Sequence, residues 1–254
     1  MLLELRNVVK KFGGITALSD ISFGVEKGDI FGIIGPNGAG KTTIFNMITG
    51  VYPVTSGDVL FNGASLLGKK THEIIDGGIA RTFQNIRLFA NMTVLENILV
   101  GRHPRLHTGL LGSVLHTKAM REEEADSVRE AHALLQYVGL DDVADHIATE
   151  LPYGKQRKLE IARAMASHPQ LILLDEPAAG MNDQETAALT ELIRGIREQF
   201  GITVILIEHD MNLVMNLTNR LIVVNFGSKL AEGTPAEVQN NTAVIEAYLG
   251  KEED

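Results

Sequence analysis

Residues 35–42 read GPNGAGKT, which matches the phosphate-binding loop pattern G-x-x-x-x-G-K-[ST]. The apolar run 30–34 precedes this loop and the segment 43–48 follows it, so we expect a strand to enter the loop and a helix to leave it. The glycines allow backbone N–H groups to turn toward phosphates, and the helix N-terminus adds a partial positive charge. The pattern predicts that a nucleoside triphosphate binds to Gly35, Pro36, Asn37, Gly38, Ala39, Gly40, Lys41, Thr42 and Thr43.

Two side chains of the loop have predicted roles of their own. Lys41 is expected to reach the β- and γ-phosphates, and the Thr42 hydroxyl is expected to bind Mg²⁺. The alternative interpretation is a glycine-rich turn between a strand and a helix with a lysine there by chance. The flanking apolar segments favour the phosphate-binding interpretation.

Composition excludes several other classes. The chain has 254 residues, 44% hydrophobic and 22% charged, which is ordinary for a globular protein. It contains no cysteine, so disulfides and thiolate metal sites are excluded. The N-terminus does not resemble a signal peptide, and no run of about 18 apolar residues occurs. A net charge of −9 argues against general attraction to nucleic acid or anionic lipid.

The order of the patterns predicts the fold class. Residues 2–34 alternate in short apolar and polar runs typical of strands, whereas 171–174, 204–207 and 221–224 are continuously apolar, as in buried parallel strands. Helical periodicity over 186–200 separates two of these runs. We therefore expect an α/β fold: a P-loop core with a parallel sheet, an N-terminal β layer and an inserted helical subdomain.

The middle of the chain is expected to be helical. Thr93 to Glu96 has the spacing of a capping box, 101–112 has the composition of a loop, and 117–139 has the pattern of an amphipathic helix. Further on, Thr234-Pro235 is a good helix start. The expected division is a single ATPase domain over 1–254, with core segments 1–86 and 158–240, a helical subdomain at about 87–157 and a C-terminal tail at 241–254.

Acidic and imidazole side chains follow two of the apolar runs. Asp175 and Glu176 come directly after 171–174, and His209 follows 204–207. Ligands of α/β sheets bind beyond the carboxyl ends of the strands, so these groups are expected beside the P-loop. Asp175 is then a magnesium ligand, Glu176 polarises a water for attack on the γ-phosphate, and His209 lies near that phosphate or water. By themselves, the two acids could also form a helix cap and a turn.

Together these motifs resemble an ABC-type ATPase subunit, a likeness that covers nearly the whole chain. The resemblance implies a P-loop NTPase (RecA-like) core with an N-terminal antiparallel β layer and an inserted helical subdomain. The resemblance implies that Gln84 contacts Mg²⁺ or the attacking water and links the core to the helical subdomain. It also implies that Phe12 stacks on adenine, although a core or surface role for that ring stays open.

The family's signature segment departs from its usual form in this chain. Where the family has Leu-Ser-Gly-Gly-Gln, this sequence has Leu151, Pro152, Tyr153, Gly154 and Lys155. In the family, this segment contacts ATP held by a second subunit through the serine hydroxyl and a helix N-terminus. Pro152 has neither a hydroxyl nor an N–H group. The contact would then depend on the Gly154 backbone, the helix dipole and Lys155.

Within the family, the chain is most similar to the ATP-binding subunits of bacterial and archaeal branched-chain amino acid uptake systems. The similarity lies in Leu2 to Leu18, Ile79 to Phe89, the Tyr153-Gly154 signature with its helix, and Glu176 to Asn182. The segment 101–120 also resembles one of the two ATPase paralogues of such systems.

This resemblance implies cofactors, partners and a location. We expect ATP and Mg²⁺, a homo- or heterodimer of ATPase subunits, transmembrane permeases, an extracytoplasmic binding protein and no nucleic acid. The chain is expected in the cytoplasm, held on the inner face of the membrane by the permeases. The alternative is a non-transport ATPase of the same superfamily acting in DNA repair or translation, but the single P-loop and the lack of extended heptads argue against it. A GTPase is disfavoured because no Asn-Lys-x-Asp tetrapeptide occurs.

Overall fold

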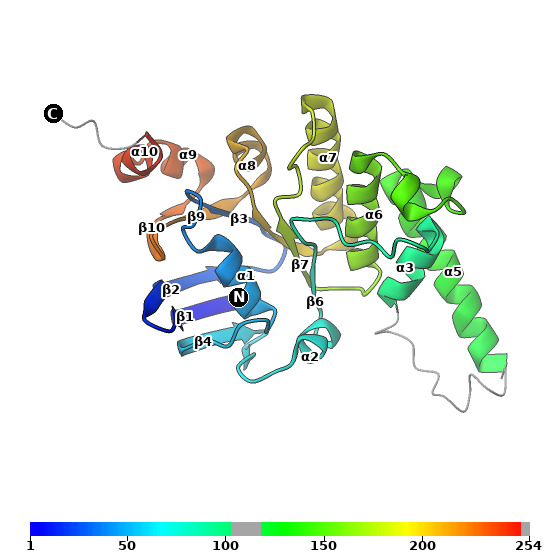
Figure 1. The fold of residues 1–254 in the computed structure, drawn as a ribbon, viewed down its shortest axis with the longest axis horizontal. Coiled ribbons are helices and arrows are strands. Elements are labelled where there is room, and N and C mark those ends of the chain that lie inside the picture. The colour runs from blue at the N-terminus through cyan, green and yellow to red at the C-terminus, as the bar shows by residue number, and fades with distance from the viewer. Residues whose placement is uncertain (103–117, 250–254) are drawn as a thin grey trace. The chain divides into compact units, whose positions relative to one another are not determined.

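A computed structural model describes residues 1–102 and 118–249 of the chain (Figure 1). The chain divides into two compact units, the first formed by Met1–Arg81 with Gln170–Asp254 and the second by Thr82–Pro169. The second unit extends further at both ends than the segment 87–157 expected for the helical subdomain. Each unit has its own packing and is considered separately.

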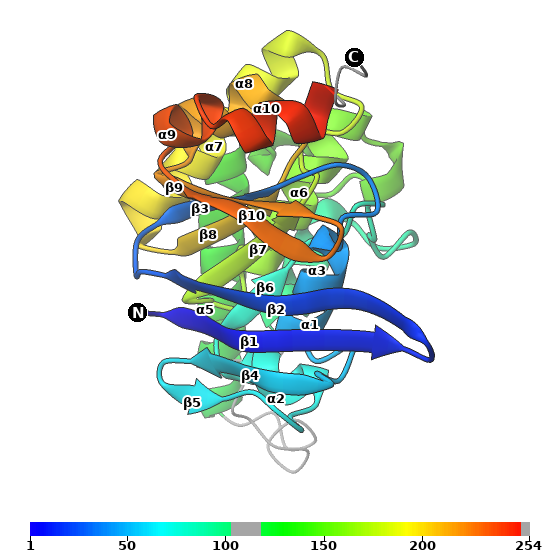
Figure 2. The same ribbon diagram turned by 90° about the vertical axis from the view of Figure 1, so that its left-hand side faces the viewer.

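The first unit begins with a four-stranded antiparallel sheet in the order β2-β1-β4-β5 (Figure 2). Its strands are β1 (Leu3–Phe12), β2 (Ile15–Val25), β4 (Ser56–Phe61) and β5 (Ala64–Ser65). Asn62 and Gly63 connect β4 to β5 with φ values of 51° and 77°, the left-handed geometry that Asn-Gly favours in a two-residue hairpin turn. The predicted antiparallel layer is confirmed.

The second sheet carries the predicted parallel core. Its order is β10-β9-β3-β8-β7-β6, and β9, β3, β8, β7 and β6 pair in parallel while β10 is antiparallel to β9. The strands are β3 (Ile30–Ile34), β6 (Ile79–Arg81), β7 (Leu171–Asp175), β8 (Thr203–Ile207), β9 (Arg220–Asn225) and β10 (Ser228–Gly233). Every residue of β3, β7 and β8 is buried, which explains the continuous apolar runs 171–174 and 204–207 within β7 and β8.

Six helices are described in this first unit. They are α1 (Lys41–Ile48), α2 (Thr71–Asp76), α7 (Asp183–Phe200), α8 (Met211–Leu217), α9 (Pro235–Gln239) and α10 (Thr242–Leu249). Thr234 caps α9 in a capping box with proline at the start, as the sequence predicts. Asn182 and Glu185 form a second capping box at the start of α7. Helix α10 occupies 242–249 of the expected C-terminal tail at 241–254.

The core of the first unit lies between its two sheets. Leu3, Leu5 and Ile21 of the antiparallel sheet belong to one buried cluster with Phe31 and Ile207 of the parallel sheet. Helix α1 contributes Ile44, Phe45 and Ile48 to the same cluster. Because α1 directly follows the P-loop, this burial anchors the loop on both sides: by the buried strand β3 and by a helix whose apolar face is inside.

The second unit is helical. Its helices are α3 (Val94–Arg102), α5 (Lys118–Val138), α6 (Tyr153–Met165) and the short 3₁₀ turns at Asp141–Val143 and Ala148–Glu150. The predicted capping box is present, since Thr93 N donates to Glu96 and Glu96 N donates to Thr93 Oγ1. The loop predicted at 101–112 is wrong at its start, because Gly101 and Arg102 end α3; the remainder of that segment lies outside the described residues.

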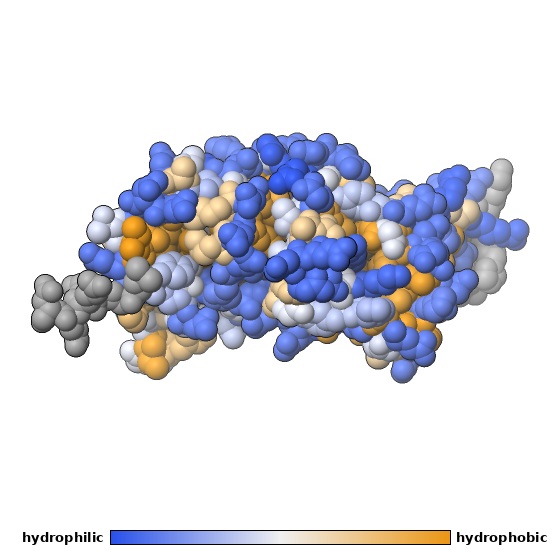
Figure 3. All heavy atoms as spheres, turned by 90° about the horizontal axis from the view of Figure 1, so that it is seen from above, coloured by the Kyte–Doolittle hydropathy of each residue, from blue (hydrophilic) through white to orange (hydrophobic). Residues whose placement is uncertain are grey.

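Polar residues dominate the face of the protein seen in Figure 3, with small apolar groups between them. Over residues 1–102 and 118–249, no helix has the length and apolarity needed to cross a bilayer.

Candidate nucleotide-binding and hydrolysis site

The P-loop lies between β3 and α1 in the first unit, as its sequence predicts. The backbone conformation and close neighbours of two loop positions favour glycine there. Gly35 has φ 149° and Gly40 has φ 107°, a region that disfavours side chains. A Cβ on Gly35 would overlap the carbonyl oxygen of Val224, and one on Gly40 would overlap the Leu18 side chain. At Gly35 the loop passes too close to the Val224 backbone for any other residue, and at Gly40 the positive φ disfavours one.

Lys41 is buried at the start of α1, with 6% of its surface exposed. Its Nζ atom donates to the carbonyl oxygens of Gly35 at 2.7 Å and of Pro36 at 3.0 Å. Burial lowers the pKa of Lys41 from its usual value, while the charges of Glu176 and Asp175 act in the opposite direction. An ammonium group held inside the loop by two carbonyls is suited to bind an anion that enters the loop.

The predicted acids lie at the carboxyl end of β7. Asp175 is the last residue of that strand and is 2% exposed. Glu176 follows with φ 47°, and its N–H donates to Ile207 O at 2.9 Å. This left-handed geometry is uncommon for glutamate. It turns the chain sharply after the strand. The side chains of Asp175 and Glu176 therefore do not alternate between the two faces of the sheet as neighbours in a strand would.

Strand register brings His209 to Glu176. Asp175 is paired with Ile207 in the β7–β8 ladder, so the residues just after each strand end lie at the same edge. The Nε2 atom of His209 is 2.9 Å from Oε1 of Glu176. The predicted convergence of these two side chains is therefore observed, and strand β3, which leads into the P-loop, is the other neighbour of β8.

The residues of the first unit suit magnesium as part of a nucleotide complex. Thr42 and Asp175 offer a hydroxyl and a carboxylate, which are hard oxygen donors of the kind that Mg²⁺ prefers. No cluster of three or more Asp, Glu, His or Cys side chains able to hold a metal occurs in the described part of the chain. A site with few protein ligands fits an ion whose other ligands are phosphate oxygens and water.

Sequence reasoning missed a buried partner of Asp175. Arg81, at the end of β6, donates to Asp175 Oδ2 at 2.8 Å, and their side chains are only 7% and 4% exposed. Arg81 also donates to Asn46 of α1 at 2.7 Å, and its guanidinium lies 5.4 Å from the centre of the Phe45 ring. The cation thereby joins the strand that carries Asp175 to the helix that follows the P-loop. An isolated arginine in an apolar stretch provides no sequence signal for this contact.

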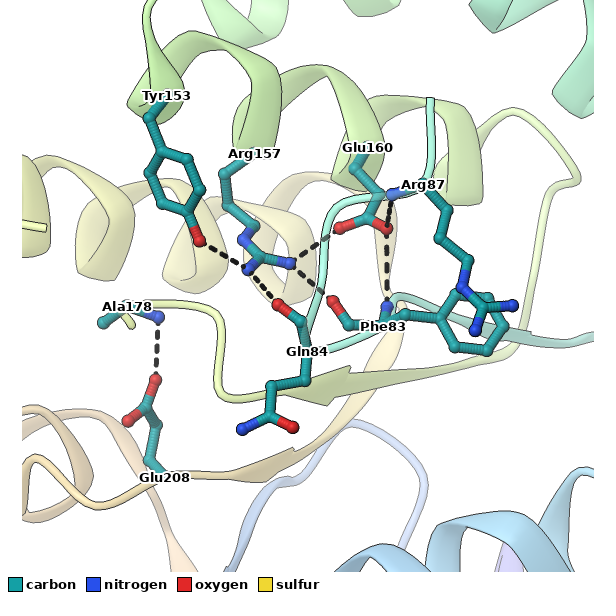
Figure 4. A network of polar contacts seen from close by, with 8 residues as sticks. All are labelled: Phe83, Gln84, Arg87, Tyr153, Arg157, Glu160, Ala178 and Glu208. Atoms are coloured by element: carbon teal, nitrogen blue, oxygen red, sulfur yellow. Dashed lines mark hydrogen bonds and ion pairs between the residues drawn. The ribbon is translucent and has the colours of Figure 1, made fainter. Parts of the chain in front are cut away.

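A second missed residue is Glu208, which lies between β8 and His209. It is 4% exposed, and its Oε1 accepts from Ala178 N at 2.8 Å (Figure 4). Burial raises the pKa of Glu208 above its ordinary value, opposed by N–H donors from Ala178, His209 and Asp210. Glu208 thus fixes the segment after Glu176 to the segment that carries His209.

Phe12 ends β1 and keeps 41% of its surface exposed. Its ring meets the edge of Tyr52 with centroids 5.1 Å apart, and Lys10 Nζ lies 4.6 Å from the Phe12 centroid. A ring that is exposed and held in position by neighbours is suited to stack on another flat group.

A cavity of about 650 Å³ also opens beside the P-loop. It is lined on one side by loop residues 36–39 and on the other by α10 and the turn between β9 and β10. Its lining includes four of the predicted nucleotide-binding residues, 36–39, but not Lys41, Thr42, Asp175 or Glu176.

The second unit holds the remaining predicted residues. Pro152 is the N-cap of α6, and Tyr153, Gly154 and Lys155 form its first turn. Leu151 is buried just before this helix start. The backbone oxygen of Gln84 accepts from Arg157 of α6 at 2.7 Å (Figure 4). The segment of Gln84 and the helix of the signature motif are thus in direct contact within this unit.

A P-loop between a buried parallel strand and a helix, with an acid pair and a histidine at the neighbouring strand ends, defines a P-loop nucleotide-binding protein. Comparison with known proteins specifies the family. The sequence profile described as "ABC transporter" matches residues 18–179, and one described as "Branched-chain amino acid ATP-binding cassette transporter" matches 228–254.

Individual relatives cover nearly the whole chain. The high-affinity branched-chain amino acid transport ATP-binding protein LivG of Salmonella typhimurium is 46% identical over 98% of both chains. A probable LivG of Archaeoglobus fulgidus is 36% identical over 99% of this chain and 96% of its own. Among solved structures, the ADP conformation of MJ1267, an ATP-binding cassette of an ABC transporter, superposes with a TM-score of 0.85 at 35% identity, covering 98% of this chain and 99% of its own.

The chain belongs to the family of ABC transporter ATP-binding proteins. The predicted fold class and family are confirmed, and so is the predicted class of ATP-hydrolysing transport subunit. The alternative of a DNA-repair or translation ATPase is not favoured by these relatives.

Proposed function

We propose that this protein is the ATP-hydrolysing subunit of an importer for branched-chain, hydrophobic amino acids. The 2.9 Å contact between Glu176 and His209, in the same unit as the P-loop, is the observation that supports hydrolysis in addition to binding. The transported substrate is inferred from the relatives, which are named for branched-chain amino acid transport and match the chain over 98% of its length. Substrate choice lies in other subunits, so no residue of this chain contacts the amino acid.

In this proposal each predicted site residue of the first unit has a defined role. The P-loop amides of 35–43 and the ammonium of Lys41 hold the phosphates. Thr42 and Asp175 would hold Mg²⁺, and the family resemblance adds Gln84 as a ligand; the ion would neutralise charge on the phosphate oxygens. Phe12 stacks on the adenine ring.

Glu176 acts on the attacking water. Its carboxylate accepts a hydrogen bond from the water and orients it in line with the γ-phosphate. His209 fixes the rotamer of Glu176 through the Oε1 contact and presents its ring to the same region. Because two strand ends that pair in register carry both side chains, their geometry is set before nucleotide binds.

Two ATPase subunits cooperate in the proposed cycle. The signature segment, residues 151–155, contacts ATP bound to the other subunit; a related cassette, MJ0796, with 26% identity, has been solved as a dimer. Pro152 supplies no hydroxyl, so the contact uses the Gly154 backbone and the positive end of α6. ATP favours the closed pair, and loss of the γ-phosphate lets it open.

The proposed partners follow from the family. The helical unit transmits the closing motion to transmembrane permeases, which hold the chain at the inner face of the cytoplasmic membrane, and an extracytoplasmic binding protein delivers the amino acid. The dimer consists of two copies of this chain or of this chain and a paralogue.

Two measurements test the proposal. The purified chain should hydrolyse ATP in the presence of Mg²⁺, with GTP competing poorly, and Lys41→Ala should abolish the activity. In cells that lack the gene, uptake of labelled leucine, isoleucine or valine should fall and return with the wild-type chain but not with Lys41→Ala. Unchanged uptake of all three amino acids would refute the proposed transport role but not the proposed ATP hydrolysis.

A further inference from the structure

The second unit contains a fully buried ion pair on the helix that carries the signature motif. Arg157 Nη1 donates to Glu160 Oε2 at 2.8 Å, and the two side chains are 0% and 1% exposed. Both lie on α6, one turn apart. Arg157 is among the largest fully buried side chains in the described part of the chain.

Most of the contacts of this pair are with one short backbone segment, residues 83–87 (Figure 4). Arg157 Nη1 donates to Phe83 O at 2.7 Å, and its Nη2 donates to Gln84 O at 2.7 Å. Glu160 Oε1 accepts from Arg87 N at 3.2 Å and, more weakly, from Phe83 N at 3.4 Å. A cation and an anion on one helix thus bind both carbonyls and N–H groups of the same segment.

The segment needs these partners because it has no regular secondary structure. Residues 82–89 are neither helix nor strand, so their backbone groups are not satisfied by a ladder or a helix. Buried backbone groups without partners are costly. Arg157 and Glu160 provide residues 83–87 with the hydrogen-bond partners that a neighbouring strand would provide in a sheet.

Apolar side chains at positions 157 and 160 would cost less free energy to bury. A buried ion pair loses the hydration of both charges, and well-packed apolar replacements are often as stable or more stable. The planar guanidinium has a specific advantage, because its fork can donate to two neighbouring carbonyls and a carboxylate at once. The geometry therefore favours a role in fixing the position of one segment relative to another.

The contacts continue to the start of α6. Arg157 Nη2 lies 3.1 Å from the hydroxyl of Tyr153, the first residue of that helix. Gly154, which is predicted to contact nucleotide held by a second subunit, is the next residue. One guanidinium thus links the carbonyl of Gln84 to the first turn that carries the signature motif.

We propose that Arg157 and Glu160 are positioning residues that make segment 83–87 and the N-terminal turn of α6 move as one body. This inference rests on the proposed function, in which Gln84 responds to nucleotide and Gly154 contacts the nucleotide of a second subunit. A displacement of Gln84 then moves Gly154 with it. Binding of nucleotide in one subunit thereby sets the orientation of the surface offered to the other.

Amide hydrogen exchange of the full chain tests this coupling, with Mg²⁺ and a nonhydrolysable ATP analogue as the probe. In the wild type, the analogue should change protection of residues 83–87 and of the first turn of α6 together. In Arg157→Met/Glu160→Leu, the change at the α6 turn should fall to about a fifth or less, while that at the P-loop stays. Arg157→Lys keeps the charge but not the fork, so it should show the same loss to a smaller degree.

Steady-state kinetics supply a second readout. The double variant should lose about tenfold or more in kcat for ATP with KM within about twofold, because nucleotide binding in its own subunit is intact. The matched control is Arg102→Lys, a change at another buried arginine of the same unit that pairs with Glu130. It should leave both the coupled exchange and kcat near wild-type values.

The possible outcomes separate this inference from the function on which it rests. A wild type that neither binds nor hydrolyses ATP refutes the proposed function. A wild type whose P-loop responds to the analogue, together with a folded variant in which both segments still respond and kcat is unchanged, overturns the coupling. If the double variant does not fold, Arg157→Lys decides by the same criteria.

Discussion

The Nε2 atom of His209 lies 2.9 Å from Oε1 of Glu176, although 33 positions separate the two residues in the chain. The register of β7 against β8 creates this contact, since it sets Asp175 opposite Ile207. The sheet therefore holds the side chains of Glu176 and His209 beside each other. Substitutions at either residue are expected to act on the same step.

Glu176→Gln should separate binding from hydrolysis. The amide keeps the size of the side chain but cannot accept a proton from water, so kcat for ATP should fall by roughly 10²- to 10⁴-fold. Affinity for an ATP analogue should stay within about twofold, because Glu176 is not expected to contact the phosphates directly. Turnover near the wild-type rate would remove Glu176 from its predicted role.

His209→Ala should interact strongly with the preceding change. Alone it should lower kcat about tenfold or more, since the carboxylate loses the group that orients it. Combined with Glu176→Gln it should add little, as residues that act as a unit are not additive. A double-mutant cycle of kcat checks this. Fully additive effects would show that the two side chains act independently.

Lys41→Ala should weaken nucleotide binding without harming the fold. A lost charge-assisted contact is worth about 1.5–3 kcal/mol, or roughly ten- to a hundredfold in Kd. The free energy of unfolding should stay equal or rise, because burial already disfavours the Lys41 cation, as its lowered pKa indicates. Calorimetric titration and urea unfolding provide the two measurements. Lys229→Ala, at a surface pair with Glu232, is the control and should change neither.

Arg81→Met tests the buried pair with Asp175. Breaking one side of a buried ion pair leaves the other charge without compensation, so the free energy of unfolding should fall by about 3–5 kcal/mol. Adding Asp175→Leu should recover much of this loss, but it should abolish ATP hydrolysis because the predicted magnesium ligand is gone. Urea unfolding measures both. Arg220→Met, at a more exposed pair with Glu232, should cost much less; equal costs at the two sites would contradict the argument from burial.

Glu208 should make stability depend on pH above its ordinary pKa. Its pKa is raised by burial in the folded chain, so the folded state binds more protons than the unfolded state between the two pKa values. Stability therefore falls as pH rises through that window. As pH rises from about 4.5, the wild type should lose free energy of unfolding relative to Glu208→Gln. A difference independent of pH would contradict it.

Much of the fold could be predicted because its signals are local. The continuous apolar strands, the capping box at Thr234 and the Asn62-Gly63 turn each depend on residues within a few positions of one another. Short elements escaped prediction: α2, β6 and α8 span six, three and seven residues. Such lengths are too short for a helical or strand period to be distinguished from chance.

The sequence alone determined that this chain has a P-loop, a parallel core and acids at a strand end. These features are recognised from residues close together in the chain, namely a loop motif and the apolar runs beside it. Only the tertiary structure decided that Arg81 pairs with Asp175, that Glu208 holds Ala178, and that Arg157 and Glu160 bind the backbone of 83–87. These contacts join residues between 30 and 94 positions apart. Which charges meet at such separations is set by strand register and helix packing, and no spacing along the chain specifies either.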